Sequence, residues 1–120
     1  MSEMQTYAGG CQCGAVRYEV ETDLSSMGEC NCSRCQPLGW VLQSAPASAF
    51  KLLNGEESLS LYQFNTKTIE HLFCKVCGVE SFARGTGQDG AAMVMINVNC
   101  LDGVPKVDRS TIQQWDGRSW

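Results

Sequence analysis

The positions of the eight cysteines constrain this chain more than any other feature of its sequence. Two pairs stand far apart: Cys11 and Cys13 in GGCQCGAV, and Cys74 and Cys77 in FCKVCGVE. A glycine follows each pair directly and allows the tight turn that would present two sulfurs to one ion. Because two such half-sites complete a tetrahedral site, we predict a structural zinc clasp that joins the beginning of the chain to its middle.

Other uses of these thiols remain open. A C-x-x-C pair can be a redox dithiol, and four thiolates can hold iron instead of zinc. The N-terminal segment MSEMQTYAGG lacks the basic start and apolar run of a secretory signal, and no run of about 18 apolar residues occurs. We therefore expect a cytoplasmic protein without a membrane span, in which clustered cysteines are better interpreted as metal ligands or reactive thiols than as disulfides.

The middle cluster is different because Cys30, Cys32 and Cys35 all lie within the single segment GECNCSRCQPLGW. Three protein ligands leave a tetrahedral ion with one open position, which is the pattern of a catalytic zinc. Three alternatives stay open: the thiols are simply buried apolar groups, Cys100 closes the site as a fourth ligand, or the cluster holds iron and sulfur. The open-site interpretation predicts a second, catalytic zinc.

Size and charge narrow the class of protein. The chain has 120 residues and a mass of 13.1 kDa, which fits one domain spanning residues 1–120. The formal net charge is −4, and the nine Lys and Arg residues are scattered along the chain. Because phosphate contacts require clustered basic residues, we expect no nucleic-acid partner. The sequence does not indicate an oligomeric state.

Alternating side chains indicate a mainly β fold. Val16, Tyr18 and Val20 alternate with charged residues, as in a half-buried strand. The segments LSLYQF, IEHLFC and AAMVMINV have a similar strand character. Turn signals separate them at Asn54-Gly55, Gly85-Thr86-Gly87, Asp89-Gly90, Asp102-Gly103 and Asp116-Gly117. Without a helical period over three turns, we predict short antiparallel strands and one helical turn after Cys32.

The segments GGCQCGAVRYEV, CNCSRCQ, FCKVCG and NVNCLDG together make the chain similar to the glutathione-dependent formaldehyde-activating enzymes and their centromere-protein-V-like relatives. The resemblance implies a β-tent fold, a zinc clasped by the two outer cysteine pairs and a second zinc on the central triplet. It also implies addition of the glutathione thiol to formaldehyde, which gives S-hydroxymethylglutathione and is formally a carbon–sulfur lyase reaction in reverse. Glutathione or a related thiol would then be the small-molecule partner.

Four other side chains have two interpretations each. Arg34 is a solvated loop residue or a ligand for a substrate carboxylate, and His71 is a strand residue or a general base. Trp40 and Phe50 belong to the core or line the pocket beside the triplet. Two other functions compete with the enzyme: a non-catalytic zinc-stabilised binding module, and a thiol redox or metal-buffering protein.

Overall fold

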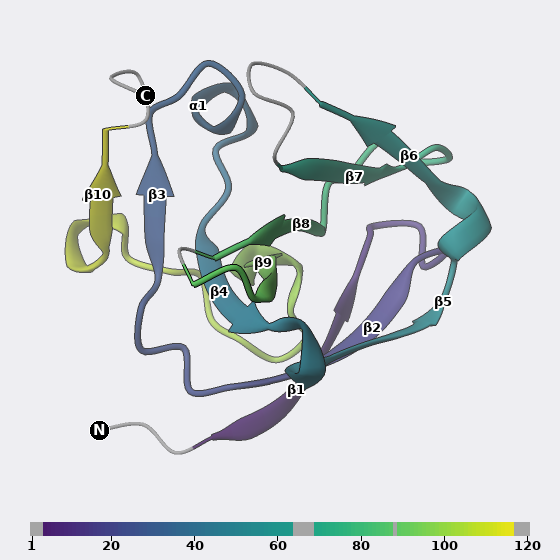
Figure 1. Cartoon of the computed structure of the whole chain (residues 1–120), viewed down its shortest axis with the longest axis horizontal. Helices are drawn as coiled ribbons and strands as arrows, with labels where there is room; N and C mark the ends of the chain where they lie inside the picture. Colours follow the sequence, from purple (N-terminus) through teal and green to yellow (C-terminus); the bar gives the residue numbers. More distant parts are fainter. Residues whose placement is uncertain (1–3, 64–68, 88, 117–120) are drawn as a thin grey trace.

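A computed structural model describes residues 4–63, 69–87 and 89–116, and it is mainly β, as the sequence predicts (Figure 1). Among these residues the strands are β1 (Gln5–Gly10), β2 (Arg17–Thr22), β3 (Gly28–Cys30), β4 (Leu42–Pro46), β5 (Phe50–Asn54), β6 (Leu59–Tyr62), β7 (Glu70–Cys74), β8 (Phe82–Thr86), β9 (Ala92–Asn97) and β10 (Gln113–Trp115). The helical segments are α1 (Cys35–Leu38), η1 (Ala47–Ala49), η2 (Glu56–Ser58), η3 (Val98–Cys100) and η4 (Arg109–Thr111). None of the helices described is long and apolar enough to cross a membrane.

The strands form two sheets. The smaller has the order β1-β2-β5, and the larger has the order β10-β3-β4-β9-β8-β7-β6. All pairings between named strands are antiparallel except that of β10 with β3, which is parallel and departs from the expected pattern. A parallel neighbour needs a long connection, and β10 comes from far along the chain, after the segment that follows β9. The C-terminal strand therefore lies beside the segment that leads into the cysteine triplet (Figure 1).

The apolar residues that alternate with charged residues around β2 are buried, as the sequence predicts. The side chains of Val16, Tyr18 and Val20 are fully buried. Tyr18 packs against Phe50 and Phe82 with ring centroids 5.0 and 5.6 Å apart, and its hydroxyl donates a hydrogen bond of 2.9 Å to the Ser81 carbonyl. These aromatic rings lie in the core between the sheets, which places Phe50 in the core and not beside the triplet.

The turn signals are mostly confirmed. Gly55, Gly90 and Gly103 have positive φ angles of 99°, 83° and 74°. The signal at Gly85-Thr86-Gly87 is misplaced, since β8 continues through Gly85 and Thr86 and the chain reverses after it, where the Gly87 amide donates to the Ala91 carbonyl. Gly117, the last turn glycine expected from the sequence, lies outside the described residues.

The two faces of the large sheet carry different clusters of side chains. Phe82 in β8 belongs to the core that faces the small sheet, whereas its neighbour Ala83 packs with Trp40 and the cysteine triplet. Successive residues of a strand point to opposite faces. The triplet therefore lies on the outer face of the large sheet, away from the core between the sheets.

Candidate metal centres

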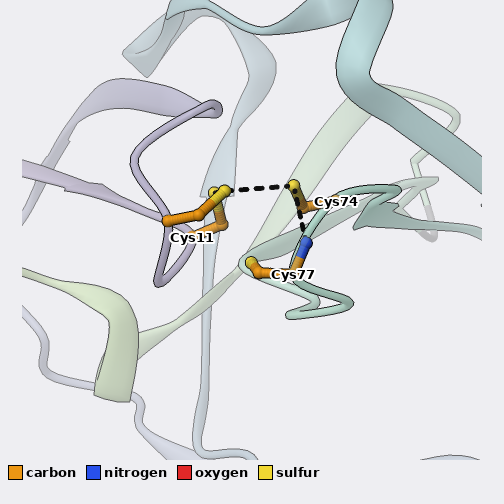
Figure 2. A group of neighbouring side chains, drawn as sticks. Cys11, Cys74 and Cys77 are labelled. Carbon is orange, nitrogen blue, oxygen red and sulfur yellow. Dashed lines mark hydrogen bonds between the residues drawn. The ribbon is translucent and has the colours of Figure 1, made fainter.

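The two outer cysteine pairs meet in space. The sulfurs of Cys11, Cys13, Cys74 and Cys77 all lie within 4.8 Å of one another, and Figure 2 shows labelled members of this tetrad converging from two separate segments. The Cys11–Cys13 and Cys13–Cys74 sulfur distances are 3.6 and 3.7 Å. A tetrahedral site with zinc–sulfur bonds of about 2.3 Å requires sulfurs about 3.8 Å apart. The tetrad could therefore hold a zinc-sized ion with little rearrangement.

Backbone turns present these sulfurs as the sequence predicts. The glycine after each pair adopts a positive φ, 83° at Gly14 and 82° at Gly78, which other residues rarely adopt. The turns also direct amide groups at the sulfurs: the Val16 amide lies 3.3 Å from the Cys11 sulfur, and the Val76 amide lies 3.3 Å from the Cys74 sulfur. Such N–H donors stabilise thiolate charge, which is the form that binds metal.

The thiol groups of the tetrad titrate unequally. The amide of Cys77 lowers the pKa of Cys74. Burial opposes ionisation of Cys77, but the amides of Val79 and Cys13 outweigh it and bring the pKa of Cys77 to about 6. The Ala15 amide acts in the same direction on Cys13, yet burial and the neighbouring sulfurs raise the pKa of Cys13 to about 11. Four converging thiolates repel one another, so full ionisation requires a cation among them.

The triplet forms a second cluster in which Cys30, Cys32 and Cys35 place their sulfurs within 4.8 Å of one another. All three are buried, with exposed fractions of 7%, 9% and 8%. The Cys32 amide lies 3.4 Å from the Cys30 sulfur, and the Cys35 amide lies 3.2 Å from the Cys32 sulfur. Helix α1 begins at Cys35 and supplies the predicted helical turn. Three convergent sulfurs with donated amides suit a metal ion better than they suit plain apolar packing.

Trp40 forms part of the wall around the triplet. Its exposed fraction is 3%, and its indole nitrogen has no hydrogen-bond partner within the part of the chain that the structure describes. Burial raises the pKa of Cys35, and the indole N–H of Trp40 opposes that rise. Because a buried donor without an acceptor is unfavourable, we interpret the indole N–H as a donor to sulfur charge at Cys35. Trp40, unlike Phe50, therefore lies at the triplet.

A cavity of about 210 Å³ opens beside the triplet. It is lined by Glu29, Cys30, Asn31, Cys35, Gln36, Gly39, Trp40, Arg109 and Gln114. Arg109 forms an ion pair with Glu29 and donates to the Gly39 carbonyl, so the C-terminal segment closes one side of the cavity. Sequence reasoning missed Arg109 and Gln114, since nothing in their local pattern signals a contact with residues 70 or more positions earlier.

Arg34, inside the triplet segment, has a partner within the chain. Its guanidinium donates a hydrogen bond of 2.7 Å to Glu80 and lies 4.7 Å from the centroid of the Tyr62 ring. The Glu80 side chain is almost completely buried, with an exposed fraction of 1%. The pair holds the triplet segment against the large sheet, so Arg34 is not a solvated loop residue. Glu80 was also missed, although a lone carboxylate between Val79 and Ser81-Phe82 is a detectable signal of a buried polar contact.

Cys100 lies on the side of the tetrad. Burial raises the pKa of Cys100 to about 11, and the negative charges of Cys11 and Cys77 act in the same direction. Among the described residues, the group of convergent ligands at the triplet contains three cysteines and does not include Cys100. The structure thus gives no support to the interpretation in which Cys100 caps the triplet.

Known proteins share this combination of sequence and mainly β fold. A sequence model of the glutathione-dependent formaldehyde-activating enzymes matches residues 6–117. The chain belongs to this family. A crystal structure of a Rhodobacter sphaeroides protein is similar to this family member, with a TM-score of 0.78 and 33% sequence identity. That alignment covers 89% of this chain and 98% of the other. The predicted family and fold class are thereby confirmed.

Proposed function

We propose that the protein is a zinc-dependent enzyme that adds the thiol of glutathione, or of a related small thiol, to formaldehyde. The observation that carries the proposal is the cluster of Cys30, Cys32 and Cys35, which offers three sulfurs beside a cavity in a member of the formaldehyde-activating family. A site of three protein ligands keeps a coordination position for a reacting group. The tetrad, by contrast, supplies four ligands and has the closed pattern of a structural site.

The proposed reaction forms one carbon–sulfur bond. The thiol sulfur bonds to the carbonyl carbon of formaldehyde, the carbonyl π electrons move to oxygen, and the proton lost by the thiol is taken up on that oxygen. The product is S-hydroxymethylglutathione, and the reverse reaction is that of a carbon–sulfur lyase. A zinc ion held by the triplet would supply Lewis acidity, lowering the pKa of a thiol or polarising a carbonyl oxygen.

The residues of the chain position the reactants. The cavity beside Cys30 and Cys35 has a volume of about 210 Å³, which is below the usual range for sites that enclose a drug-sized ligand. It admits the reacting thiol and a one-carbon aldehyde, while the rest of a tripeptide would lie outside. Trp40 lines the cavity, and its indole N–H is the group that we interpret as favouring negative charge on Cys35. Arg34, held by Glu80, fixes the segment that carries the three cysteines.

We also propose the number of zinc ions, the extent of the domain and the cellular compartment. Two zinc ions per chain, one structural at Cys11, Cys13, Cys74 and Cys77 and one catalytic at the triplet, are supported by the two convergent clusters. A single domain over residues 1–120 is supported by a family match that runs from residue 6 to residue 117. Seven cysteines gathered into two potential metal sites suit the reducing cytoplasm, where thiols serve as ligands.

The first experiment measures the zinc-to-chain ratio by elemental analysis and native mass spectrometry on protein purified under reducing conditions. The wild type is compared with the double variant Cys32→Ala/Cys35→Ala and with Cys100→Ala as the matched control. We expect two ions in the wild type and in Cys100→Ala, and one ion in the double variant with the fold retained. One ion in all three proteins would remove the catalytic-zinc proposal and favour a binding module or a redox protein.

Activity must be separated from the uncatalysed reaction, because thiols add to formaldehyde readily in water. Two-dimensional exchange NMR with ¹³C-formaldehyde and glutathione measures how fast carbon moves between hydrate and adduct at equilibrium. We expect the zinc-loaded wild type to accelerate this exchange and the double variant to leave it at the protein-free rate. Equal exchange rates with the two proteins would contradict the proposed reaction.

A further inference from the structure

One cavity among the described residues lies away from both cysteine clusters. Its volume is about 610 Å³, within the usual range for small-molecule sites. It lies between the small sheet and one end of the large sheet and is lined by Ala47, Phe50, Leu52, Gln63, Glu70, Arg84, Gly85, Thr86, Ala92, Met93 and Val94. It contains no cysteine, so the proposed thiol chemistry does not use it.

The large sheet separates this cavity from the triplet. Arg84 lines the cavity and lies two residues after Phe82, which belongs to the core between the sheets. Ala83, between them, packs with the triplet on the other face. Because successive strand residues alternate between faces, a ligand held by Arg84 would be on the opposite side of the sheet from Cys30 and Cys35. The cavity is therefore a separate site and not an extension of the triplet cavity.

Two opposite charges line the cavity, and neither forms an ion pair with a described residue. Glu70 in β7 and Arg84 in β8 are direct partners in the antiparallel register, and both are half-buried. Opposite charges in such positions commonly pair. Yet neither residue takes part in any of the ion pairs of the described residues. The Arg84 guanidinium instead lies 5.4 Å from the centroid of the Phe82 ring. A carboxylate and a guanidinium are thus both available to a ligand.

Most of the remaining wall of the cavity is apolar, with Gln63 and Thr86 as the other polar residues. Phe50 and Leu52 come from the small sheet, and Met93 and Val94 come from β9. A matching ligand carries one negative group, one positive group close to it, and an apolar substituent. Cross-strand partners have Cβ atoms about 5 Å apart. The side chains of Glu70 and Arg84 can therefore reach two charged groups that a ligand carries on a single carbon atom. An α-amino acid with an aliphatic side chain has this arrangement.

We propose that this cavity binds a zwitterionic α-amino acid with an aliphatic side chain. The Arg84 guanidinium receives the ligand carboxylate in a forked contact, and the Glu70 carboxylate receives the ammonium group. The aliphatic side chain lies against Phe50 and Met93. Binding at this cavity does not depend on the proposed reaction at the triplet, so a test of one does not decide the other.

The test titrates ¹⁵N-labelled, zinc-loaded protein with three probes of matched carbon skeleton: L-leucine, 4-methylpentanoate (leucine without its ammonium group) and isopentylamine (leucine without its carboxylate). Leucine carries both charges, whereas each of the other probes carries one. We expect saturable amide shifts at Gly85, Thr86 and Met93 with leucine, and affinities at least about ten-fold lower for the other two probes, the loss expected from one charged contact. Absence of saturable leucine shifts, or equal affinities for the three probes, would overturn the proposal.

Variants assign the two contacts. Arg84→Gln should abolish the preference for leucine over isopentylamine, and Glu70→Gln should abolish the preference for leucine over 4-methylpentanoate. Glu70→Gln preserves side-chain size, whereas Arg84→Gln shortens the side chain, and an unchanged pattern of amide signals away from the cavity checks that each variant folds. Lys106→Gln, at an exposed position, is the matched charge control and should leave all three affinities unchanged. Unchanged leucine binding in both cavity variants would contradict the assignment.

Discussion

The Nδ1 atom of His71 lies 2.7 Å from Oε2 of Glu80, and the two side chains are almost completely buried, with exposed fractions of 4% and 1%. The other carboxylate oxygen of Glu80 accepts from Arg34, which stands between Cys32 and Cys35. Glu80 follows Cys77 by three residues, and His71 precedes Cys74 by three residues. One buried carboxylate therefore connects the segment of the triplet to the hairpin that carries half of the tetrad. His71 is a structural strand residue in this arrangement and not an accessible base.

Glu80→Gln should be strongly destabilising. The substitution removes the negative charge but leaves Arg34 in place, and breaking one side of a buried ion pair typically costs about 3–5 kcal/mol. We expect this loss in urea unfolding of the zinc-loaded protein at neutral pH, with zinc lost from the triplet before it is lost from the tetrad. Glu21→Gln changes the same charge at an exposed strand position and is the control. Similar unfolding midpoints for the two variants would contradict the role given to Glu80.

Trp40→Phe should weaken metal binding at the triplet while the tetrad remains unchanged. The variant retains an aromatic ring but removes the N–H that favours the charged form of Cys35. Hydrogen bonds to charged groups contribute about 1.5–3 kcal/mol, so we expect at least a ten-fold loss of affinity at this site. In the cobalt-substituted protein, the sulfur-to-metal charge-transfer band of the triplet should shift.

Trp115→Phe is the matched control for this prediction. Trp115 packs against the same cluster of side chains, and its ring lies over Gly28. Because the proposed N–H contact belongs to Trp40 alone, Trp115→Phe should leave the metal affinity and the charge-transfer band of the triplet close to those of the wild type. Equal effects of the two substitutions would mean that ring packing, and not the indole N–H, determines the properties of the site.

Much of the fold and both cysteine clusters could be predicted because local chemistry determines them. The tetrad follows from two cysteine pairs with glycines at 14 and 78, since each turn is specified within a few residues. The buried side chains of Val16, Tyr18 and Val20 follow from a period of two. These features depend on neighbours in the sequence, so the sequence alone reveals them.

The surroundings of the triplet could not be predicted because they depend on contacts between distant segments. Arg109 forms an ion pair with Glu29, and the Trp115 carbonyl accepts a hydrogen bond of 3.2 Å from the Asn31 amide. Both contacts accompany the parallel pairing of β10 with β3, which no local sequence pattern indicates. The cavity with Glu70 and Arg84 has the same origin, because two unremarkable charges become a site only when β7 and β8 bring them together. Register between strands is decided by tertiary packing.

Tyr18→Phe should change how stability depends on pH in alkaline solution. Burial raises the pKa of Tyr18 well above its ordinary value of 10.0. Above about pH 10 the unfolded chain loses this proton while the folded chain retains it, so the stability of the wild type falls by about 1.4 kcal/mol per pH unit. The variant has no phenol at this position and therefore lacks this loss of stability with rising pH. At neutral pH it should be about 1 kcal/mol less stable, because the hydrogen bond to the Ser81 carbonyl is lost.

Urea unfolding at pH 8, 10 and 11 checks this prediction. The stability deficit of Tyr18→Phe should shrink between pH 10 and pH 11. Phe50→Leu, which alters the same aromatic cluster without a titrating group, should show a deficit that does not change with pH. A constant deficit for Tyr18→Phe over this range would mean that the phenol ionises as readily in the folded state as in the unfolded state.

Gly10→Ala and Gly14→Ala should differ although both alter the turn that carries Cys11 and Cys13. A Cβ atom at Gly10 would lie 2.0 Å from the carbonyl oxygen of Val16, which accepts the Cys11 amide at 3.1 Å. A Cβ atom at Gly14 meets nothing within 4 Å, and only the positive φ of 83° opposes it.

We therefore expect Gly14→Ala to lower the free energy of unfolding by about 1–2 kcal/mol, the usual penalty of left-handed backbone, and to retain the metal of the tetrad. Gly10→Ala should be more destabilising and should displace Cys11, so that zinc leaves the tetrad at lower chelator concentration. Gly14→Asn, with a residue that tolerates left-handed backbone, should recover part of the loss. Urea unfolding and chelator titration compare the three variants, and a Gly10→Ala protein as stable as Gly14→Ala would contradict the close approach of Gly10 to Val16.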